Sequence, residues 1–379
     1  MNKYLNGLLH ELIAKATVLK SKIPGAFELN VYFEALSTKA NIEIDDVINK
    51  ALFYITDSRL NHDSTVKQKV KYIKQLNQKL SILETVVVAA LMRNHDDDIY
   101  VNQLVREICK EIKYPIDRPV VTCLSQDSYH IYPQYNLLCV PLLEADFLLH
   151  IPILYHELAH PIISNENPKV KLFIGQLGQF NSMVIDHFAK EVKREEMNDH
   201  RQDFIDSIYL WRDSWTENWS TEFFCDLFAL YTLGPAFAWS YLHLIVKVSS
   251  NVFNYDIDSH PPDDARIKVL IHGLNLIGFK DDAKKILKKW NDFIVAMEYD
   301  KKKKGRYDSA VPDFFLEDIA VRALQGTKNI GCKIVTPTDN DGIMKKMLND
   351  AWVVFWKDMS SFQEWEEQEV KKLRNTFNS

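Results

Sequence analysis

Apolar residues recur every three or four positions through the first hundred residues, which is the pattern of α-helices that bury one face. One series runs from Leu5 to Leu19, and a second runs from Val66 to Val87 in steps of seven, with further apolar residues between the steps. The second series predicts a long packed helix that could form half of an antiparallel hairpin. We therefore expect a helical lobe at the amino-terminal end of the chain.

The pattern changes after a further predicted helix at 100–113. Short runs rich in strand-forming residues follow, and turn-forming residues separate them; they lie at 119–124, 129–132 and 135–140. Helical periodicity then returns, with predicted helices at 263–276, at 281–297 and from 343 to about 374. The sequence thus predicts a mainly α protein with a small antiparallel β-sheet, an α+β fold.

One apolar stretch has the length of a membrane span. Residues 227–246 contain no Asp, Glu, Lys or Arg, which meets the usual criterion for a transmembrane helix. Gly234 and Pro235 interrupt it, and this pair favours the end of one helix and the start of another. We expect two buried helices of about ten residues here, and no stable membrane insertion. The amino terminus lacks a basic head and an apolar core, so no signal peptide is expected.

Composition narrows the classes of partner. With 379 residues, 46% of them hydrophobic and 26% charged, the chain should fold as a globule of two or three domains. Its formal charge of −6 opposes contact with phosphate backbones, so no nucleic acid partner is expected. The five cysteines are odd in number and show no C-x-x-C spacing. This argues against a disulfide framework or a thiolate zinc cage, and favours the reducing cytoplasm.

The strongest chemical motif is H-E-x-x-H, which spans His156, Glu157 and His160. A spacing of four residues is just over one helical turn, so both imidazoles can share one face and hold one ion. Neutral imidazole suits Zn²⁺, and Glu157 could accept a proton from a metal-bound water without being a ligand. Because hydrolytic zinc sites use three protein ligands and one open position, a third ligand is needed.

Glu222 is the candidate for the third ligand. Glu222 and Asp226 stand four residues apart among apolar residues, where a carboxylate is costly to bury unless it is paired or bound to a cation. Asp226 could then accept the N–H of a ligating histidine and fix its orientation. The alternative is that Glu222 serves only the start of a helix capped by Ser220 or Thr221. Cys225 projects away from the ligand direction and is expected to be a small buried hydrophobe.

A third motif contains His260, two prolines and Arg266. Prolines commonly open a helix, so this segment could be an ordinary helix start. In an active site, His260 could instead donate a hydrogen bond to the oxyanion that forms when water adds to an amide. Arg266 could orient Glu222 or another carboxylate of the site.

Taken together, the three motifs resemble those of the gluzincin zinc metallopeptidases, particularly the M48-like, HtpX-type branch. The resemblance covers about residues 135–276 and implies a zincin-like catalytic core that hydrolyses peptide bonds of a peptide or protein substrate. It implies one Zn²⁺ per chain, a general base, a supporting carboxylate and two groups that stabilise the transition state. In this resemblance the zinc ligands are His156, His160 and Glu222, and the general base is Glu157. The supporting carboxylate is Asp226, and the two groups that stabilise the transition state are His260 and Arg266.

The strand before the metal-binding helix is a further candidate for function. In zincins this strand is commonly the edge along which an extended peptide pairs, so its backbone groups could bind substrate. The candidate residues are Asn136, Leu137, Leu138, Cys139 and Val140. The alternative is an interior strand with no such role.

The sequence predicts three parts: an N-terminal helical lobe at 1–97, a catalytic core at 98–278 and a C-terminal helical region at 279–379. The first hypothesis for function is a soluble zinc metalloendopeptidase. The second is a catalytically silent zincin-fold protein with a binding or regulatory role. The N-terminal lobe could be a scaffold, a lid or the docking site of a regulatory partner.

Overall fold

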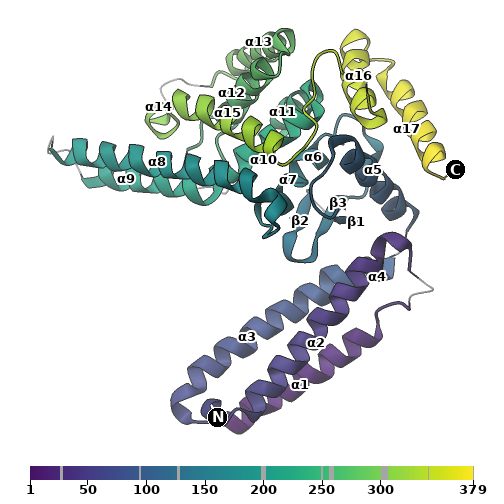
Figure 1. The fold of residues 1–379 in the computed structure, drawn as a ribbon, viewed down its shortest axis with the longest axis vertical. Helices are drawn as coiled ribbons and strands as arrows, with labels where there is room; N and C mark the ends of the chain where they lie inside the picture. The colour runs from purple at the N-terminus through teal and green to yellow at the C-terminus, as the bar shows by residue number, and fades with distance from the viewer. Residues whose placement is uncertain are drawn as a thin grey trace. The chain divides into compact units, whose positions relative to one another are not determined.

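The computed structural model describes residues 1–25, 29–93, 95–125, 129–197, 202–248, 251–255, 260–299, 306–339 and 341–378. Across these residues the protein is mainly α-helical with a small three-stranded sheet, which confirms the predicted fold class (Figure 1). The chain forms two compact units. The first comprises Met1–Gln103 and Pro119–Leu142, and the second comprises Leu104–Arg118 and Leu143–Ser379. Segment 119–142, which the sequence analysis assigned to the central part, thus packs with the N-terminal helices.

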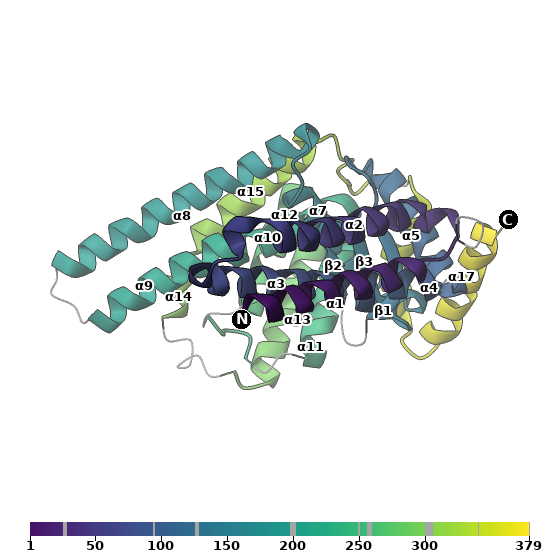
Figure 2. The ribbon, with the colours of Figure 1, turned by 90° about the horizontal axis from the view of Figure 1, so that it is seen from below.

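The first unit is built on long helices that lie side by side, as both views show (Figures 1 and 2). They are α1 (Asn2–Ser21), α2 (Glu34–Thr56) and α3 (Val66–Ile82), and α3 continues through a π-helical turn, Leu83–Val88, into α4 (Ala89–Arg93). The predicted apolar faces are buried: Leu5, Leu9 and Leu12 of α1 are at most 3% exposed. Apolar side chains of the sheet, including Leu137, join the same core.

The sheet is mixed, whereas the sequence analysis expected an antiparallel one. Its strands are β1 (Val120–Ser125), β2 (His130–Tyr132) and β3 (Leu137–Pro141), in the order β1-β3-β2. A tight connection makes β2 and β3 antiparallel, but β1 pairs in parallel on the opposite side of β3. The outer edge of β1 is occupied by α5 (Asp96–Ile112), where Asn102 bonds both the N–H and the C=O of Val121.

The proposed substrate-binding role of residues 136–140 is therefore wrong. Leu137, Leu138 and Cys139 pair with β1 on one side and with β2 on the other. The carbonyl of Asn136 already accepts the N–H of Val120. A strand whose two neighbours use its backbone groups has no free edge for an extended peptide. The alternative, an interior strand, is what the structure contains.

The second unit contains the candidate site and is helical. Its helices, besides the end of α5, are α6 (Ile153–Glu157), α7 (Ala159–Ile163), α8 (Lys171–Met197), α9 (Gln202–Ser214), α10 (Ser220–Leu233), α11 (Pro235–Val248), α12 (Asp263–Leu276), α13 (Lys280–Ala296), α14 (Tyr307–Ala310), α15 (Asp313–Asn329), α16 (Ile343–Lys357) and α17 (Phe362–Asn378). The central helix is α10, which packs against α6, α7, α8, α11, α12 and α15. Almost all of its residues are buried, so side chains on α10 are held from several sides.

The apolar stretch 227–246 is divided as predicted. Helix α10 ends at Leu233, Gly234 adopts a φ of 97°, and α11 begins at Pro235. Glycine adopts such a positive φ without the steric cost that other residues pay. Among the described residues, no helix is both long enough and apolar enough to cross a membrane.

The single helix predicted from 343 to about 374 is wrong, because the chain breaks between α16 and α17. The Asp358 side chain accepts hydrogen bonds from the backbone N–H groups of Ser360 and Ser361. Such local side-chain bonds compete with helical backbone bonds and favour a turn.

Candidate metal centre

The H-E-x-x-H motif lies on two short helices, α6 and α7, that meet at Leu158. Pro161 explains the break, because a proline has no N–H to donate to the carbonyl four residues earlier, here that of Glu157. The Tyr114 hydroxyl donates to the carbonyl of Leu158 at 2.8 Å. Leu158 itself keeps right-handed helical angles, so His156 and His160 still face the same way.

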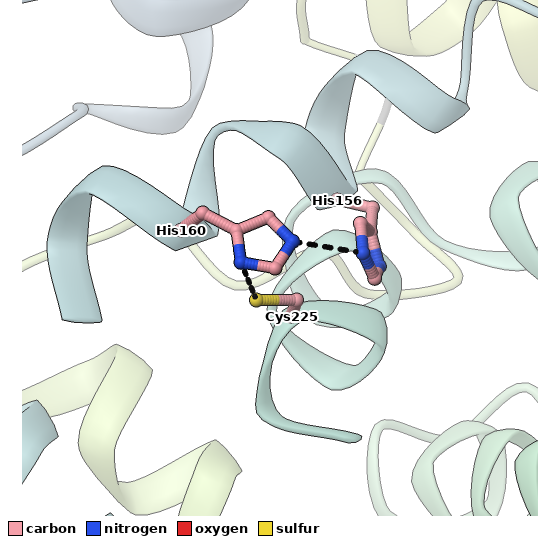
Figure 3. A group of neighbouring side chains, drawn as sticks. All are labelled: His156, His160 and Cys225. Atoms are coloured by element: carbon pink, nitrogen blue, oxygen red, sulfur yellow. Dashed lines mark hydrogen bonds between the residues drawn. The ribbon is translucent and has the colours of Figure 1, made fainter. Parts of the chain in front are cut away.

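The two imidazoles and one carboxylate converge on a common point. The Nε2 atoms of His156 and His160 are 3.2 Å apart, and Figure 3 shows the two rings meeting through these nitrogens. The Glu222 carboxylate lies 3.4 Å from Nε2 of His156 and 3.8 Å from Nε2 of His160. Bonds of about 2.0–2.1 Å at tetrahedral angles would separate neighbouring ligand atoms by about 3.3–3.4 Å. The three side chains therefore fit the spacing of ligands around one small divalent cation.

Helix α10 presents Glu222 to this point. A π-helical segment, Trp215–Trp219, precedes α10 directly, with Trp215 and Trp219 fully buried. A π-helical turn shifts the direction of the side chains that follow it and is frequent at functional sites. The aromatic anchors hold the start of α10 in place, and Glu222 stands on its first turn.

Burial and charge give the two histidines opposite titration behaviour in the protein without metal. Burial opposes the charged form of His156, but the hydrogen bonds that its ring N–H groups donate to Asp226 and Glu222 outweigh burial and raise the pKa of His156 to about 10. Burial and the neighbouring His156 lower the pKa of His160 to about 4. Zn²⁺ binding must displace the proton from His156, since a ligating imidazole is neutral.

Asp226 and Arg266 form a buried support behind His156. The Asp226 Oδ1 atom accepts the Nδ1–H of His156 at 2.8 Å, which leaves Nε2 facing the centre. Arg266 donates to both carboxylate oxygens of Asp226, each at 2.6 Å. Burial opposes ionisation of Asp226, but Arg266 and His156 outweigh it and hold its pKa below the usual value. Arg266 thus orients Asp226, where the sequence analysis left open Glu222 or another carboxylate.

Helix α11 contributes two aromatic residues that the sequence analysis did not assign to the site. The Phe237 ring stacks on that of His156 with centroids 6.4 Å apart. Tyr241 places its ring 4.3 Å from the guanidinium of Arg266. Both residues lie in the apolar stretch 227–246, for which the sequence predicts only buried helices. Their four-residue spacing, which puts both rings on one face of a helix, is the sequence feature that could have indicated a role at the site.

Glu157 is a buried carboxylate without a fixed partner. It is 9% exposed, and within the described residues it makes no hydrogen bond or ion pair. Burial, with a contribution from Glu222, raises its pKa to about 7, while His156 and Arg266 oppose the rise. A carboxylate with such a pKa can exchange a proton near neutral pH.

His260 lies at the exposed rim of the centre. Its side chain is 61% exposed, and its Nε2 is 3.8 Å from Oε2 of Glu222. The structure therefore brings the exposed His260 side chain next to the Glu222 carboxylate.

Cys225 is nearer to the centre than the sequence analysis expected. The group formed by His156, His160 and Cys225 has ligand atoms within 4.8 Å of one another and could hold a metal. However, Sγ of Cys225 is 3.6 Å from Nδ1 of His160, the nitrogen that faces away from His156 (Figure 3). One imidazole cannot direct both nitrogens at the same ion. With Nε2 of His160 on the metal, Cys225 would accept the Nδ1–H instead.

No protein-family model, curated protein sequence or solved structure matches this chain. All five cysteines are unpaired thiols and buried.

Proposed function

We propose that this chain is a zinc-dependent peptidase in which Glu157 acts as the general base. The observation that carries the proposal is the convergence of His156, His160 and Glu222 on one point. Beside them lies the buried carboxylate of Glu157, which makes no hydrogen bond or ion pair with any other described residue. The choice of a peptide bond as substrate rests on the resemblance of the three motifs to gluzincins. The fit to Zn²⁺ rests on the nitrogen and oxygen donor set and its tetrahedral spacing.

In this proposal each residue has a separate task. Zn²⁺, when bound, would supply a Lewis acid that polarises the carbonyl and makes water a better nucleophile. Glu157 takes a proton from the attacking water and delivers it to the leaving amine. Asp226 and Arg266 keep His156 in the tautomer that presents Nε2 to the centre. His260, at the exposed rim, donates a hydrogen bond to the oxygen of the attacked carbonyl.

Metal analysis and cleavage assays test this function together. We expect the purified protein to contain one zinc ion per chain and to cleave a denatured protein or members of a peptide library. Dialysis against a chelator should abolish cleavage, and added Zn²⁺ should restore it. Melting temperature should fall on chelation and recover with Zn²⁺, since a ligand that binds only the folded state stabilises it.

Bound zinc without any cleavage, including in the presence of candidate activating proteins, would contradict the peptidase proposal. It would support the second hypothesis, a catalytically silent zincin-fold protein with a binding or regulatory role. Absence of stoichiometric zinc from protein purified without chelator and then incubated with Zn²⁺ would contradict both hypotheses.

The ligand set makes a separate prediction for Cys225. Replacing Cys225 with serine should leave metal stoichiometry unchanged and lower zinc affinity by less than about tenfold, because serine can still accept the His160 N–H. Replacing Glu222 with alanine should instead abolish stoichiometric binding. In the Co²⁺-substituted protein we expect no thiolate-to-cobalt absorption in the near ultraviolet. A strong band of this kind that disappears in Cys225→Ser would make Cys225 a ligand.

A further inference from the structure

A cavity lies within the helical unit that contains the metal centre, and none of its lining residues belongs to the metal site. Its volume is about 500 Å³, and residues of α11, α13, α16 and the segment 335–339 line it. This volume falls in the range of small-molecule sites, about 300–1,000 Å³. The cavity is therefore large enough for an organic ligand.

Tryptophans form the apolar wall of this cavity. Trp239 of α11 and Trp352 of α16 stack with centroids 6.1 Å apart, and Trp356 approaches Trp239 at 5.1 Å. Trp356 remains 39% exposed, so part of its ring has no protein cover. Exposed aromatic surface at a concave site is typical of ligand binding.

The rim of the cavity is positively charged although the whole chain is acidic. Five lysines line it against three aspartates, and Lys345 is paired with Asp339 at 2.6 Å. The other lining lysines, all exposed, are Lys285, Lys288, Lys289 and Lys346. The Nζ atom of Lys289 lies 5.1 Å from the centroid of the Trp356 ring. A cation placed over an aromatic wall can bind the acidic group of a ligand whose body stacks on that wall.

The buried indole N–H of Trp352 is an independent indication that the cavity binds a ligand. Trp352 is 3% exposed, and its Nε1 has no hydrogen-bond partner in the described part of the chain. An unpaired buried N–H is unfavourable, and Trp352 is one of the residues that line the cavity.

We propose that this cavity binds an organic anion with a flat aromatic body, which stacks on Trp356 while its acidic group meets the lysines of α13 and α16. The site is separate from the proposed peptidase function, because it shares no residue with the metal centre. Charge complementarity selects an anion over a neutral compound, since only an anion is attracted to the exposed lysines of the rim.

Two fluorescent probes with the same aromatic body test the site on the full-length protein. Anilinonaphthalene sulfonate carries one negative charge, and phenylnaphthylamine has the same ring system without it. We expect saturable binding of one sulfonate probe per chain, with quenching of tryptophan emission, and binding of the neutral probe at least about tenfold weaker. Affinity for the anion should fall with added salt, as expected for an accessible ion pair.

Matched variants locate the binding. The combined change Lys285→Gln, Lys288→Gln and Lys289→Gln should weaken the sulfonate probe by about tenfold, and Trp356→Ala by about threefold or more. The control removes three exposed lysines of α8, with Lys171→Gln, Lys190→Gln and Lys193→Gln, and should leave affinity unchanged. Near-ultraviolet circular dichroism verifies that each variant is folded. Equal affinity for the two probes, equal loss in the control, or no loss in the cavity variants would overturn the proposal.

Discussion

Replacing Glu157 with glutamine is expected to lower kcat for peptide hydrolysis by about 10²–10⁴-fold while the protein still binds one zinc ion per chain. Glutamine has nearly the same shape as glutamate but cannot take a proton from water. Because Glu157 has no hydrogen bond or ion pair within the described residues, its replacement should not disturb a fixed network. Turnover and zinc content are measured on the same preparation.

The same residue predicts the pH dependence. Without metal, burial raises the pKa of Glu157 to about 7. A cation held at the centre favours the ionised carboxylate and so lowers this pKa. As the pH falls through the lowered pKa of the metal-bound protein, Glu157 gains a proton and can no longer act as a base. We therefore expect kcat/KM to decline on the acidic side, below pH 7, and the residual activity of Glu157→Gln to lack this decline.

A matched control separates the role of Glu157 from a general effect of lost charge. Glu217 is exposed and precedes α10 by three residues, so Glu217→Gln removes a carboxylate near the site without touching the centre. Its kcat should equal that of the unmodified protein. Normal turnover in a zinc-loaded Glu157→Gln protein would show that another group accepts the proton.

Local patterns predicted most of the helices because helix formation depends on neighbours in the sequence. The helix expected at 263–276 has the bounds of α12, and the glycine and proline at 234 and 235 end and begin helices as expected. The order of the strands was not predictable in the same way. It depends on contacts between distant residues, such as the bonds of Asn102 to Val121, which no local pattern contains.

In the candidate site, too, some features follow from local sequence and others from contacts between distant residues. The four-residue spacing of His156 and His160 was sufficient to predict that their rings meet, because one helical turn sets their separation. The approach of Glu222, 62 residues further along, required the packing of α10 against α6 and α7. Sequence reasoning also left open which carboxylate Arg266 would bind, and it did not predict that Cys225 touches His160. These contacts depend on how helices rotate against one another.

Replacing Asp226 with asparagine is expected to lower the free energy of unfolding of the metal-free protein by about 3–5 kcal/mol at pH 7. Asparagine is the same size and can still accept the His156 N–H. It cannot neutralise Arg266, however, which is 8% exposed and donates to both oxygens of Asp226. A buried guanidinium without its counter-ion is strongly destabilising. Urea unfolding, followed by circular dichroism, measures the change.

Zinc affinity should also fall in Asp226→Asn, by about 10–100-fold, because the partner that fixes His156 has lost its charge. A competition titration against a chelator of known affinity measures this effect. Unchanged zinc affinity would mean that the negative charge of the group bonded to Nδ1 of His156 does not contribute to zinc binding.

A double variant distinguishes the lost ion pair from a packing defect. Arg266→Met removes the buried positive charge but keeps an apolar stem of similar length, so Asp226→Asn with Arg266→Met should be more stable than Asp226→Asn alone. Acid titration supplies a second criterion. The pKa of Asp226 is held below its usual value, so its stabilising contribution is present at neutral pH and is lost as the pH falls through the folded-state pKa. Stability of Asp226→Asn should therefore decline less on acidification, and an equal decline in both proteins would contradict the ion pair as its cause.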